Sequence, residues 1–511
     1  MDSNSHVCDD QLSPQSERRG SVISIPLPIL GNRSPSATAW EMRYASLSEN
    51  SKRMLGILSI LNPDGVPYEL FRQGASTALR RGLLDLEYLQ NPVRFYASLQ
   101  DLTQKSIVGL DFSSLTIYIT KDLQRRSYSQ LCKDDTLRRV VFEQAVHLLA
   151  CSQPEPDKAN EHTSSSSSKQ NWEWSKRYES SIKALVQHFL GCPSACEGYE
   201  NQLASLAYQC AVYQVARSFH SAASETLRLT NDILNLSRSP NIVFMSDCRS
   251  LEARMFNETN HPAEAIKASQ ESLAYAEIAK EQDLLHAIDE RFPRILTGYA
   301  NSLSQLKDFD LATKVQQEAL DHVQKFPGYS EIRKLVHANW GSLLYCQDKY
   351  HDAARVLYQS LDSDPDQPMA LHHLGNTYLA LGKTDEALAA HAKALHLNTE
   401  RFGPQHAVSA VSMFKVGQVL VESLKEPMRA LGYLRQSLDC FLVQDSPYFN
   451  RIGAARAAHM LSRAFQEMEV YMEASEYLQF ARDLRSQVIG EVGSTADTDD
   501  YYRSLMFYWD Q

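Results

Sequence analysis

Three side chains that can bind metals stand close together in the stretch HFLGCPSAC, at His188, Cys192 and Cys196. On an unbroken helix they would share one face, and an imidazole with two thiolates is a ligand set that suits zinc. Gly191 and Pro193 interrupt such a helix, however, and the stretch lacks both a fourth ligand and the two-residue spacing of a zinc knuckle. We therefore expect no metal here, and cysteines that pack at a helix end as small apolar groups.

Phosphate binding and catalysis find equally little support in the residue pattern. Gly382-Lys383-Thr384 is the one Gly-Lys-Thr triplet, but Thr377 stands where a phosphate-binding loop requires glycine. We expect Gly382 to reverse the chain between two helices instead. His351-Asp352 lacks an accompanying nucleophile turn of the G-x-S-x-G type. No carboxylate pair or cofactor loop has a convincing spacing, so we expect a protein that is not an enzyme, without catalytic residue or cofactor.

Composition and charge are those of an ordinary folded, acidic chain. Of its 511 residues 43% are hydrophobic, and the formal net charge is -11, which leaves no broad basic face for nucleic acid. Nine cysteines, odd in number and scattered, are typical of a reducing compartment. No run of 18 apolar residues could span a membrane. We expect a soluble protein of the cytoplasm, with the nucleus as the alternative compartment.

Two similar stretches, 34 residues apart, indicate which structural elements the chain forms. Small residues recur at matching places in both, which lets two antiparallel helices approach closely. They are Gly341, Ala353 and Ser360 in the first stretch and Gly375, Ala387 and Ala394 in the second, which also has Tyr378. The pattern resembles the signature of the tetratricopeptide repeat, a pair of helices that buries its apolar face only by stacking on neighbouring pairs.

The same pattern recurs along the C-terminal two thirds of the chain. The small position of the first helix, helix A, is found at Ala211, Ala253, Ala300, Gly341, Gly375, Gly417 and Ser462. Most intervals exceed 34 residues, and these, with the Gly403-Pro404 turn, resemble the repeats of kinesin light chains. The resemblance covers about residues 204–487, with the clearest repeats at 334–367 and 368–401. It implies an all-α fold, a superhelix of about seven helical pairs.

Helix A of each pair is expected to line the concave side of such a superhelix. The residues that would face this groove are polar: Arg254, Asn257, Glu258, Asn301, Ser304, Gln305, His372, Asn376, Gln418, Glu422, His459, Arg463 and Gln466. Asparagines in this family commonly hold an extended peptide by its backbone amides, which implies a protein or peptide partner. The alternative is a set of solvated residues with no fixed ligand. No consecutive set forms the clamp for a C-terminal carboxylate, so chaperone tails are disfavoured as partners.

Four segments flank or connect these parts. Residues 1–38, rich in Ser and Pro, are predicted to be a disordered arm, in which two arginines before Ser21 would suit its phosphorylation. Residues 152–171 are predicted to be a flexible Ser-rich linker. Residues 172–203 are predicted to be connecting helices whose Trp172 and Trp174 pack on the first repeat. Residues 488–511 form an acidic, then aromatic tail that either caps the last helix or engages a partner.

Residues 39–151 have a different pattern from the repeats. Apolar residues recur at helical spacing from Met42 until the turn that begins at Asn62. A further helical run, YASLQDLTQKSIV, precedes the strand-like stretch from Ser114 to Thr120. Helices followed by a small β-wing are the outline of a winged helix, with the helical run in the place of a recognition helix.

The stretch from Trp40 to Pro67, with its L-x-I-L-S-x-L-x-P-D-G-x-P ending, is similar to the opening of the winged-helix segment in fungal NB-ARC proteins of the STAND class. In that class a nucleotide domain precedes this segment and tetratricopeptide repeats follow it. The resemblance implies that Thr120 to Leu123 match a Met-His-Asp-like motif, with Lys121 in place of the phosphate-sensing histidine. The 39 residues before Trp40 are too few for a nucleotide domain.

The function that follows from these patterns is a protein-interaction adaptor or regulatory scaffold, accessory to a fungal pathway. One alternative is a remnant or truncated nucleotide-driven NB-ARC switch. A second is a transcription-related regulator that places its winged helix on DNA, for which Arg80, Arg81, Arg125, Arg126, Arg138 and Arg139 provide charge. The residues identify neither the partner nor the oligomeric state.

Overall fold

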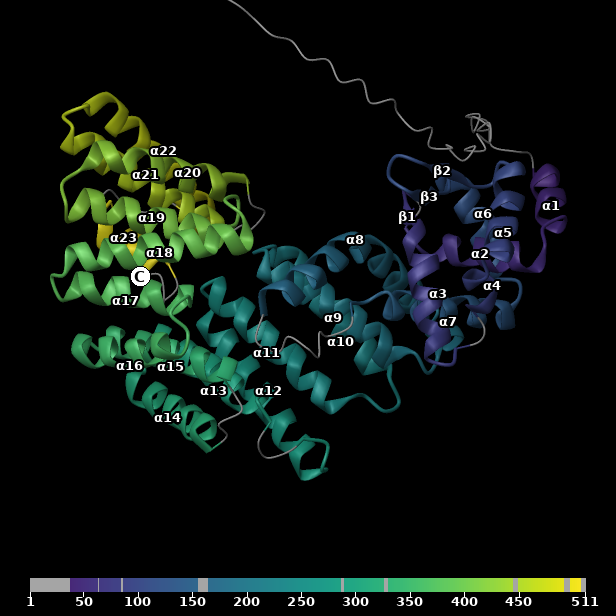
Figure 1. The fold of residues 1–511 in the computed structure, drawn as a ribbon, viewed down its shortest axis with the longest axis horizontal. Coiled ribbons are helices and arrows are strands. Elements are labelled where there is room, and N and C mark those ends of the chain that lie inside the picture. The colour runs from purple at the N-terminus through teal and green to yellow at the C-terminus, as the bar shows by residue number, and fades with distance from the viewer. Residues whose placement is uncertain are drawn as a thin grey trace, which may run out of the picture.

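The computed structural model describes residues 37–62, 64–83, 86–154, 164–285, 289–325, 330–443, 449–490 and 497–506. Almost all of the predicted disordered arm, Ser21 included, therefore lies outside the described residues. So do the middle of the predicted Ser-rich linker and the aromatic end of the tail. Figure 1 shows the remaining chain as a helical array, with a smaller helical segment at its N-terminal end.

The N-terminal segment contains helices and one small antiparallel sheet. Its elements are α1 (Ala37–Ala45), α2 (Glu49–Ile60), β1 (Val66–Pro67), the π-helical turn η1 (Leu70–Gly74), α3 (Ala75–Arg80), α4 (Glu87–Gln90), α5 (Pro92–Gln104), β2 (Gly109–Asp111), β3 (Thr116–Tyr118), α6 (Lys121–Leu131) and α7 (Asp135–Cys151). Strand β3 is central, with Ile117 opposite Val66 on one side and Leu110 on the other. The strand predicted around residues 114–120 and the helix predicted before it are both present, whereas the winged-helix assignment stays a prediction.

Side-chain caps set several helix boundaries in this segment. Ser48 accepts a hydrogen bond from the Ser51 amide, which starts α2 and divides the single helical run that periodicity alone predicted. Asn91 caps α5, and Pro92 at its first position needs no amide partner. Thr120 caps α6, so the Met-His-Asp-like positions form a helix start.

A long helix joins this segment to the array. Helix α8 (Ser164–Gly191) is followed by the 3-10 turn η3 (Pro193–Cys196). It begins inside the stretch predicted to be a linker, because the strongly apolar half after Asn171 supports a helix that extends back through the serines. One continuous hydrophobic core reaches from Trp40 through Phe142 and Phe189 to Cys248. The N-terminal segment and the first repeats are therefore packed together.

Seven helical pairs follow in the described residues, as the repeat pattern predicted. They are α9 (Glu200–Ala216) with α10 (His220–Leu236), α11 (Ile242–Glu258) with α12 (Pro262–Glu281), α13 (Arg291–Gln305) with α14 (Phe309–Lys325), α15 (Ser330–Cys346) with α16 (Tyr350–Ser363), α17 (Pro368–Ala380) with α18 (Thr384–Phe402), α19 (Ala407–Glu422) with α20 (Pro427–Val443), and α21 (Phe449–Glu467) with α22 (Tyr471–Ile489). A last short helix, α23 (Asp499–Ser504), closes the described chain. The all-α class and the superhelix of pairs are confirmed.

The small residues lie where the two helices of a pair touch. A Cβ atom added to Gly375 would stand 2.6 Å from the His391 ring, and one added to Gly417 would stand 2.6 Å from Leu434. Serine can replace alanine at such contacts because its hydroxyl bonds the facing backbone. Ser462 Oγ, for example, donates to the Ala474 carbonyl at 2.7 Å. Close packing of helix A on helix B therefore fixes each pair.

The turn between the two helices repeats even more regularly than the small residues. In each of the seven pairs one turn residue has a φ between 56° and 72°, a left-handed conformation. These residues are Ser218, Asn260, Lys307, Asp348, Gly382, Lys425 and Glu469. Gly382 is the only glycine among them, and the Gly-Lys-Thr triplet is confirmed as a chain reversal rather than a phosphate loop.

Replacing this glycine tests the turn directly. Gly382→Ala should lower the free energy of unfolding by about 1 kcal/mol, because an L side chain is strained at positive φ. Gly432→Ala is the matched control, since Gly432 lies inside α20 with an ordinary φ and with open space where the added Cβ atom would stand. That control should be neutral or stabilising. Chemical denaturation followed by circular dichroism measures both, and equal effects would contradict the assignment of the turn.

Candidate functional site: the concave groove

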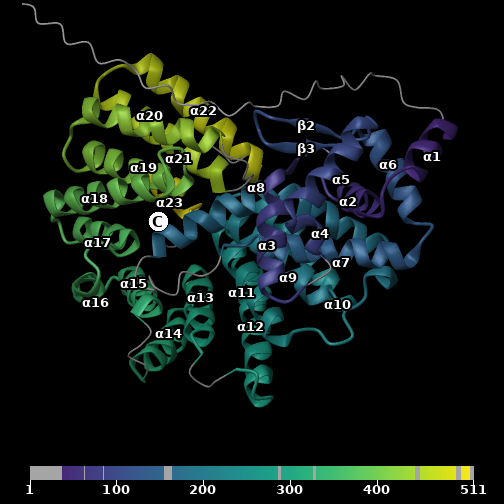
Figure 2. The same ribbon diagram turned by 45° about the vertical axis from the view of Figure 1, so that its right-hand side comes forward.

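The A helices form one side of the array. Helix α11 packs on α13, α13 on α15, α15 on α17, and α19 on α21. Each B helix packs on the next A helix, but among the described residues successive B helices are not in comparable contact with each other. The side on which neighbouring units approach closely is the concave one in a stacked array. Figure 2 shows this curvature, with α8 and α23 lying within the bend of the array.

Three of the polar residues predicted to face the groove bond to a neighbouring repeat. Asn301 Nδ2 donates to Asn339 Oδ1 at 2.9 Å, which links α13 to α15. Asn257 Nδ2 donates to the Gly298 carbonyl at 3.3 Å, and Gln305 bonds Asn260. These amides therefore connect consecutive repeats in the structure. Their role in holding a partner peptide stays a prediction.

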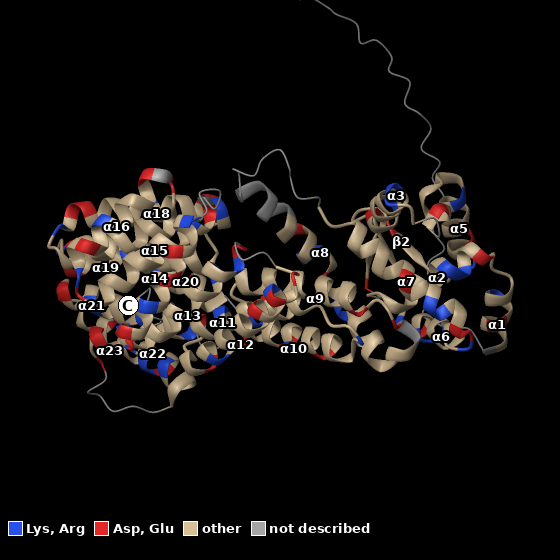
Figure 3. Ribbon diagram, turned by 90° about the horizontal axis from the view of Figure 1, so that it is seen from below, with Lys and Arg blue, Asp and Glu red and all other residues tan. Residues whose placement is uncertain are grey.

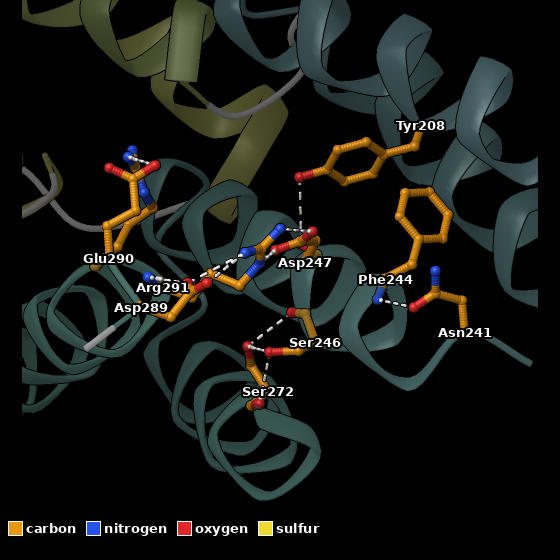
Figure 4. Close-up of polar contacts among 10 residues, drawn as sticks. Tyr208, Asn241, Phe244, Ser246, Asp247, Ser272, Asp289, Glu290 and Arg291 are labelled. Carbon is orange, nitrogen blue, oxygen red and sulfur yellow. Dashed lines mark hydrogen bonds and ion pairs between the residues drawn. The ribbon is translucent and has the colours of Figure 1, made fainter. Parts of the chain in front are cut away.

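A charged cluster, which the sequence analysis did not single out, joins the first three A helices. Figure 4 shows Arg291 of α13 between two carboxylates. Its guanidinium contacts Asp247 of α11 at 2.8 and 3.2 Å and Asp289 at 3.0 and 3.1 Å. The Tyr208 hydroxyl of α9 donates to the Asp247 backbone carbonyl at 3.4 Å. Burial raises the pKa of Asp247, which Arg291 opposes by favouring its charged form.

Removing the positive charge of Arg291 should destabilise the fold. Arg291→Gln should lower the free energy of unfolding by about 2 kcal/mol, because it leaves the half-buried Asp247 without its counter-ion. Arg294→Gln is the matched control: Arg294 is half exposed, and its ion pair with Glu290 spans 3.7 Å. We expect the control to change stability by less than about 0.5 kcal/mol. Denaturant titration distinguishes the two, and the double variant Asp247→Asn, Arg291→Gln should recover part of the loss.

The array also contacts itself across the concave side. The rings of Trp172 on α8 and Phe402 at the end of α18 stack with centroids 5.4 Å apart, and His406 stacks on Phe402 at 4.7 Å. His406 Nε2 lies 2.8 Å from the carbonyl of Ala216, at the end of α9. Residues far apart in sequence thus bring α8 and the end of α9 against the connection between the fifth and the sixth pair.

Trp172 packs differently from the prediction that the two tryptophans pack on the first repeat, whereas Trp174 shares one hydrophobic core with residues of α9 in that repeat. Trp172 packs on Phe402 of the fifth pair because the curvature of the array brings that pair beside α8. Trp174 is buried against the end of α7, where its Nε1 donates to Ser152 Oγ at 2.9 Å. The curvature that decides the Trp172 contact is a property of the whole stack, which local periodicity does not contain.

His406 is held in one protonation state by its surroundings. Its Nδ1 accepts a hydrogen bond from the Val408 amide at 3.2 Å, which caps α19, while Nε2 faces the Ala216 carbonyl. Both bonds form together only in the neutral tautomer with its proton on Nε2. Burial, and to a smaller extent the charge of Arg217, lower the pKa of His406 from 6.5 to about 4.

Neighbouring groove residues form a charged group beside His406. Glu258 pairs with Arg254 at 2.8 Å and with His220 at 2.9 Å, so the predicted contact Arg254 is bound to its own helix. Burial alone would raise the pKa of Glu258, but Arg254 and His220 outweigh it and lower the pKa to about 2. This carboxylate is therefore charged at neutral pH.

Acid should destabilise the structure around His406, where the ring contacts the Ala216 carbonyl, because burial opposes protonation of the ring. A folded-state pKa below the unfolded one means that unfolding takes up a proton between the two values, so stability is lost as pH falls from 6.5 towards 4. His406→Asn keeps a capping acceptor without the titration. Its free energy of unfolding should depend on pH by about 3 kcal/mol less than that of the unaltered chain between pH 7 and 4.

The control for this measurement is His396→Asn, because the His396 side chain is 77% exposed and pairs with Glu400 of its own helix. It should leave the pH dependence unchanged. Urea denaturation at a series of pH values provides both curves. If His406→Asn showed the same pH dependence as the unaltered chain, the neutral tautomer would not be what holds the loop.

Three further predicted groove residues are buried. His372 and Asn376 on α17 are each 5% exposed, and the His372 ring packs against His373 and His391. Gln418 on α19 is likewise 5% exposed and donates from Nε2 to Glu422 at 2.9 Å. A ligand can contact these three side chains only if the residues that bury them move aside.

His459 and Arg463 on α21, by contrast, contact the C-terminal segment of the chain itself. Arg463 forms an ion pair with Asp499, and His459 Nδ1 lies 3.2 Å from the same carboxylate. Arg485 and Arg482 of α22 bind Asp497. The sequence analysis noted the acidic and aromatic character of this tail, which was the available signal, but it missed the two α22 arginines.

Of the three residues considered for zinc, His188 packs among aromatic rings, 4.9 Å from Tyr128 and 6.0 Å from Phe142, and burial lowers its pKa to about 4. The side chain of Cys196 lies outside the described residues. Across the described part of the chain, no three His, Cys, Asp or Glu residues gather as metal ligands would.

Charge and hydropathy complete the picture of the surface. Figure 3 shows acidic and basic residues interspersed along the array in the view from below. Among the helices that the structure describes, none is both long and apolar enough to cross a membrane.

Two family profiles match parts of the chain. Residues 366–442, which span α17 to α20, match the tetratricopeptide repeat. The fifth and sixth pairs of the array are therefore tetratricopeptide repeats. Residues 42–135 match a family described as a domain of unknown function (DUF7779), which covers most of the N-terminal segment. A tetratricopeptide array is typically non-enzymatic and supports protein interaction in general.

Solved structures resemble the chain at low identity. BtubC from P. vanneervenii is 15% identical, with a TM-score of 0.37 over 46% of this chain and 93% of that one. A Rap protein complexed with competence and sporulation factor is 12% identical, with a TM-score of 0.47 over 72% and 92%. A STAND protein with a tetratricopeptide repeat sensor from Pyrococcus horikoshii is 14% identical, with a TM-score of 0.40 over 90% and 68%. Comparison with curated protein sequences finds no match.

Proposed function

We propose that this protein is an adaptor or regulatory scaffold that holds a partner polypeptide in the concave groove of its tetratricopeptide array. The observation that carries this proposal is the chain's own occupation of the groove. Phe402 and His406 lie against α8 and the end of α9 through ring contacts and a hydrogen bond. Asp497 to Met506 lies against α21 and α22 through ion pairs and apolar contacts. A surface that binds peptide segments of its own chain has the shape and polarity to bind a partner's.

The polar character of the groove supports a peptide partner over an apolar one. Amide side chains such as Asn257 and Asn301 can donate to and accept from a peptide backbone, and the Asn257 Oδ1 atom is buried without a hydrogen-bond partner among the described residues. A buried acceptor without a donor costs free energy that an incoming amide N–H would recover. A hydrogen bond from a partner's backbone amide to Asn257 Oδ1 would therefore lower the free energy of the complex.

The test compares partner recovery by the full chain and by groove variants. The full chain is needed because the core of the N-terminal segment continues into the first repeats, as far as Cys248. Asn257→Ala combined with Asn301→Ala should reduce recovery of specific partners by about tenfold or more, since each loses a partly desolvated amide contact. Affinity purification with quantitative mass spectrometry measures the change.

The matched control is Arg355→Ala on α16, a B helix, because the Arg355 side chain is 70% exposed and pairs only locally with Asp352. This variant should recover the same amount of each partner as the unaltered chain does. Thermal melts confirm that both variants remain folded. Partners recovered equally by the double variant and the control would show that binding occurs elsewhere on the protein.

A further inference from the structure

The last described segment, Asp497 to Met506, is bound in the groove through a set of charged contacts. Arg463 and His459 of α21 hold Asp499, with the His459 Nδ1 atom 3.2 Å from the carboxylate. On α22, Arg482 holds Asp497 at 2.7 Å and Arg485 holds it at 2.9 Å. Four basic side chains of the last repeat thus face two carboxylates of the segment.

An aromatic anchor accompanies the charges. The Tyr502 side chain is 1% exposed and stacks on the His459 ring, with centroids 4.3 Å apart. Its hydroxyl accepts a hydrogen bond from Arg485 at 3.2 Å, and the Arg485 guanidinium lies 5.2 Å from the Tyr502 ring. Met506 completes the contact with 2% exposure. The recognition elements are therefore two carboxylates followed by a tyrosine and an apolar residue.

The fit of this segment is incomplete. An open cleft of about 560 Å³ lies beside the segment, lined by Glu422, His459 and Arg463 on one side and by Asp497 to Asp500 and Arg503 on the other. Asp500, at the tip of the segment, is paired only with Arg503 of its own helix at 3.4 Å, and its side chain is 90% exposed. The helix α23 contacts α21, in the row of A helices, rather than extending the stack as a further pair.

We propose that this segment is a removable occupant of a peptide site, and that the site accepts a partner segment of the same chemistry: two acidic residues before a tyrosine, on a short helix. The chain's own tail then competes with the partner and keeps the site closed in its absence. This inference rests on the proposed function, because it identifies the class of peptide that the groove takes. A high local concentration favours the tail until a partner of higher affinity arrives.

The test uses the full chain and a fluorescein-labelled peptide with the sequence DTDDYYRSLM, which is that of residues 497–506. In the double variant Asp497→Asn, Asp499→Asn the tail loses its ion pairs, so the labelled peptide should bind this variant about tenfold or more tightly than the unaltered chain. Asp500→Asn is the matched control within the same segment, and it should bind the peptide as weakly as the unaltered chain does. Fluorescence anisotropy gives the affinities.

Two further measurements make the result specific. A peptide with asparagine in place of its first and second aspartates, at the positions of Asp497 and Asp499, should bind the double variant no more tightly than it binds the unaltered chain. Adding Arg463→Ala to the double variant should abolish its tighter binding of the labelled peptide, whereas adding Arg355→Ala should leave that binding unchanged. Equal peptide binding by the double variant and the unaltered chain would overturn the proposal. So would a double variant that no longer unfolds cooperatively, because the segment would then be a permanent part of the last repeat.

Failure of this inference is distinguishable from failure of the proposed function. If partners are lost on substitution of Asn257 and Asn301 but the labelled peptide never binds the opened variant, the groove binds partners of another chemistry. If the peptide binds the opened variant but the groove variants recover all partners, the tail site exists and the partners do not bind at Asn257 and Asn301.

Discussion

The close approach of helix A to helix B within each pair is the constraint on which the rest of the structure depends. At Gly375 and Gly417 there is no room for a single added carbon atom. This contact sets the angle between the helices of a pair, and a left-handed residue in the connecting turn then returns the chain in the same way each time. Because one pair leaves an apolar face uncovered, the next pair must stack on it, and seven pairs accumulate into a curved array.

Curvature has a consequence for the polar residues on the inner side. Neighbouring A helices approach so closely that their amides bond to each other, as Asn301 does to Asn339. Further along, the array meets its own earlier part, and the rings of Trp172, Phe402 and His406 stack across the groove. Asn257 and Asn301 on the concave side therefore connect repeats, and a partner must use the positions that remain or displace segments of the chain.

Electrostatics in the groove follow from the same crowding. Imidazoles at His406 and His459 are buried beside arginines, which holds their pKa near 4 and keeps them neutral at ordinary pH. The positive charge of the last repeat then comes from Arg463, Arg482 and Arg485, and it is matched by the carboxylates of the C-terminal segment. The chain is acidic as a whole, yet this part of the groove is basic. Local charge, not net charge, determines which peptide it can hold.

Much of the fold followed from the sequence alone, because close packing leaves a periodic trace of small residues. Ala211, Gly341 and Ser462 indicated the helical pairs, and Gly382 indicated a turn, since these requirements are local. The candidate site was less accessible. The positions of A-helix residues could be assigned from the repeat, but not that Asn301 bonds Asn339, that Trp172 meets Phe402, or that Asp499 meets Arg463. These contacts join residues separated by 36 to 230 positions through the accumulated curvature of seven pairs. Only the complete stack brings them together.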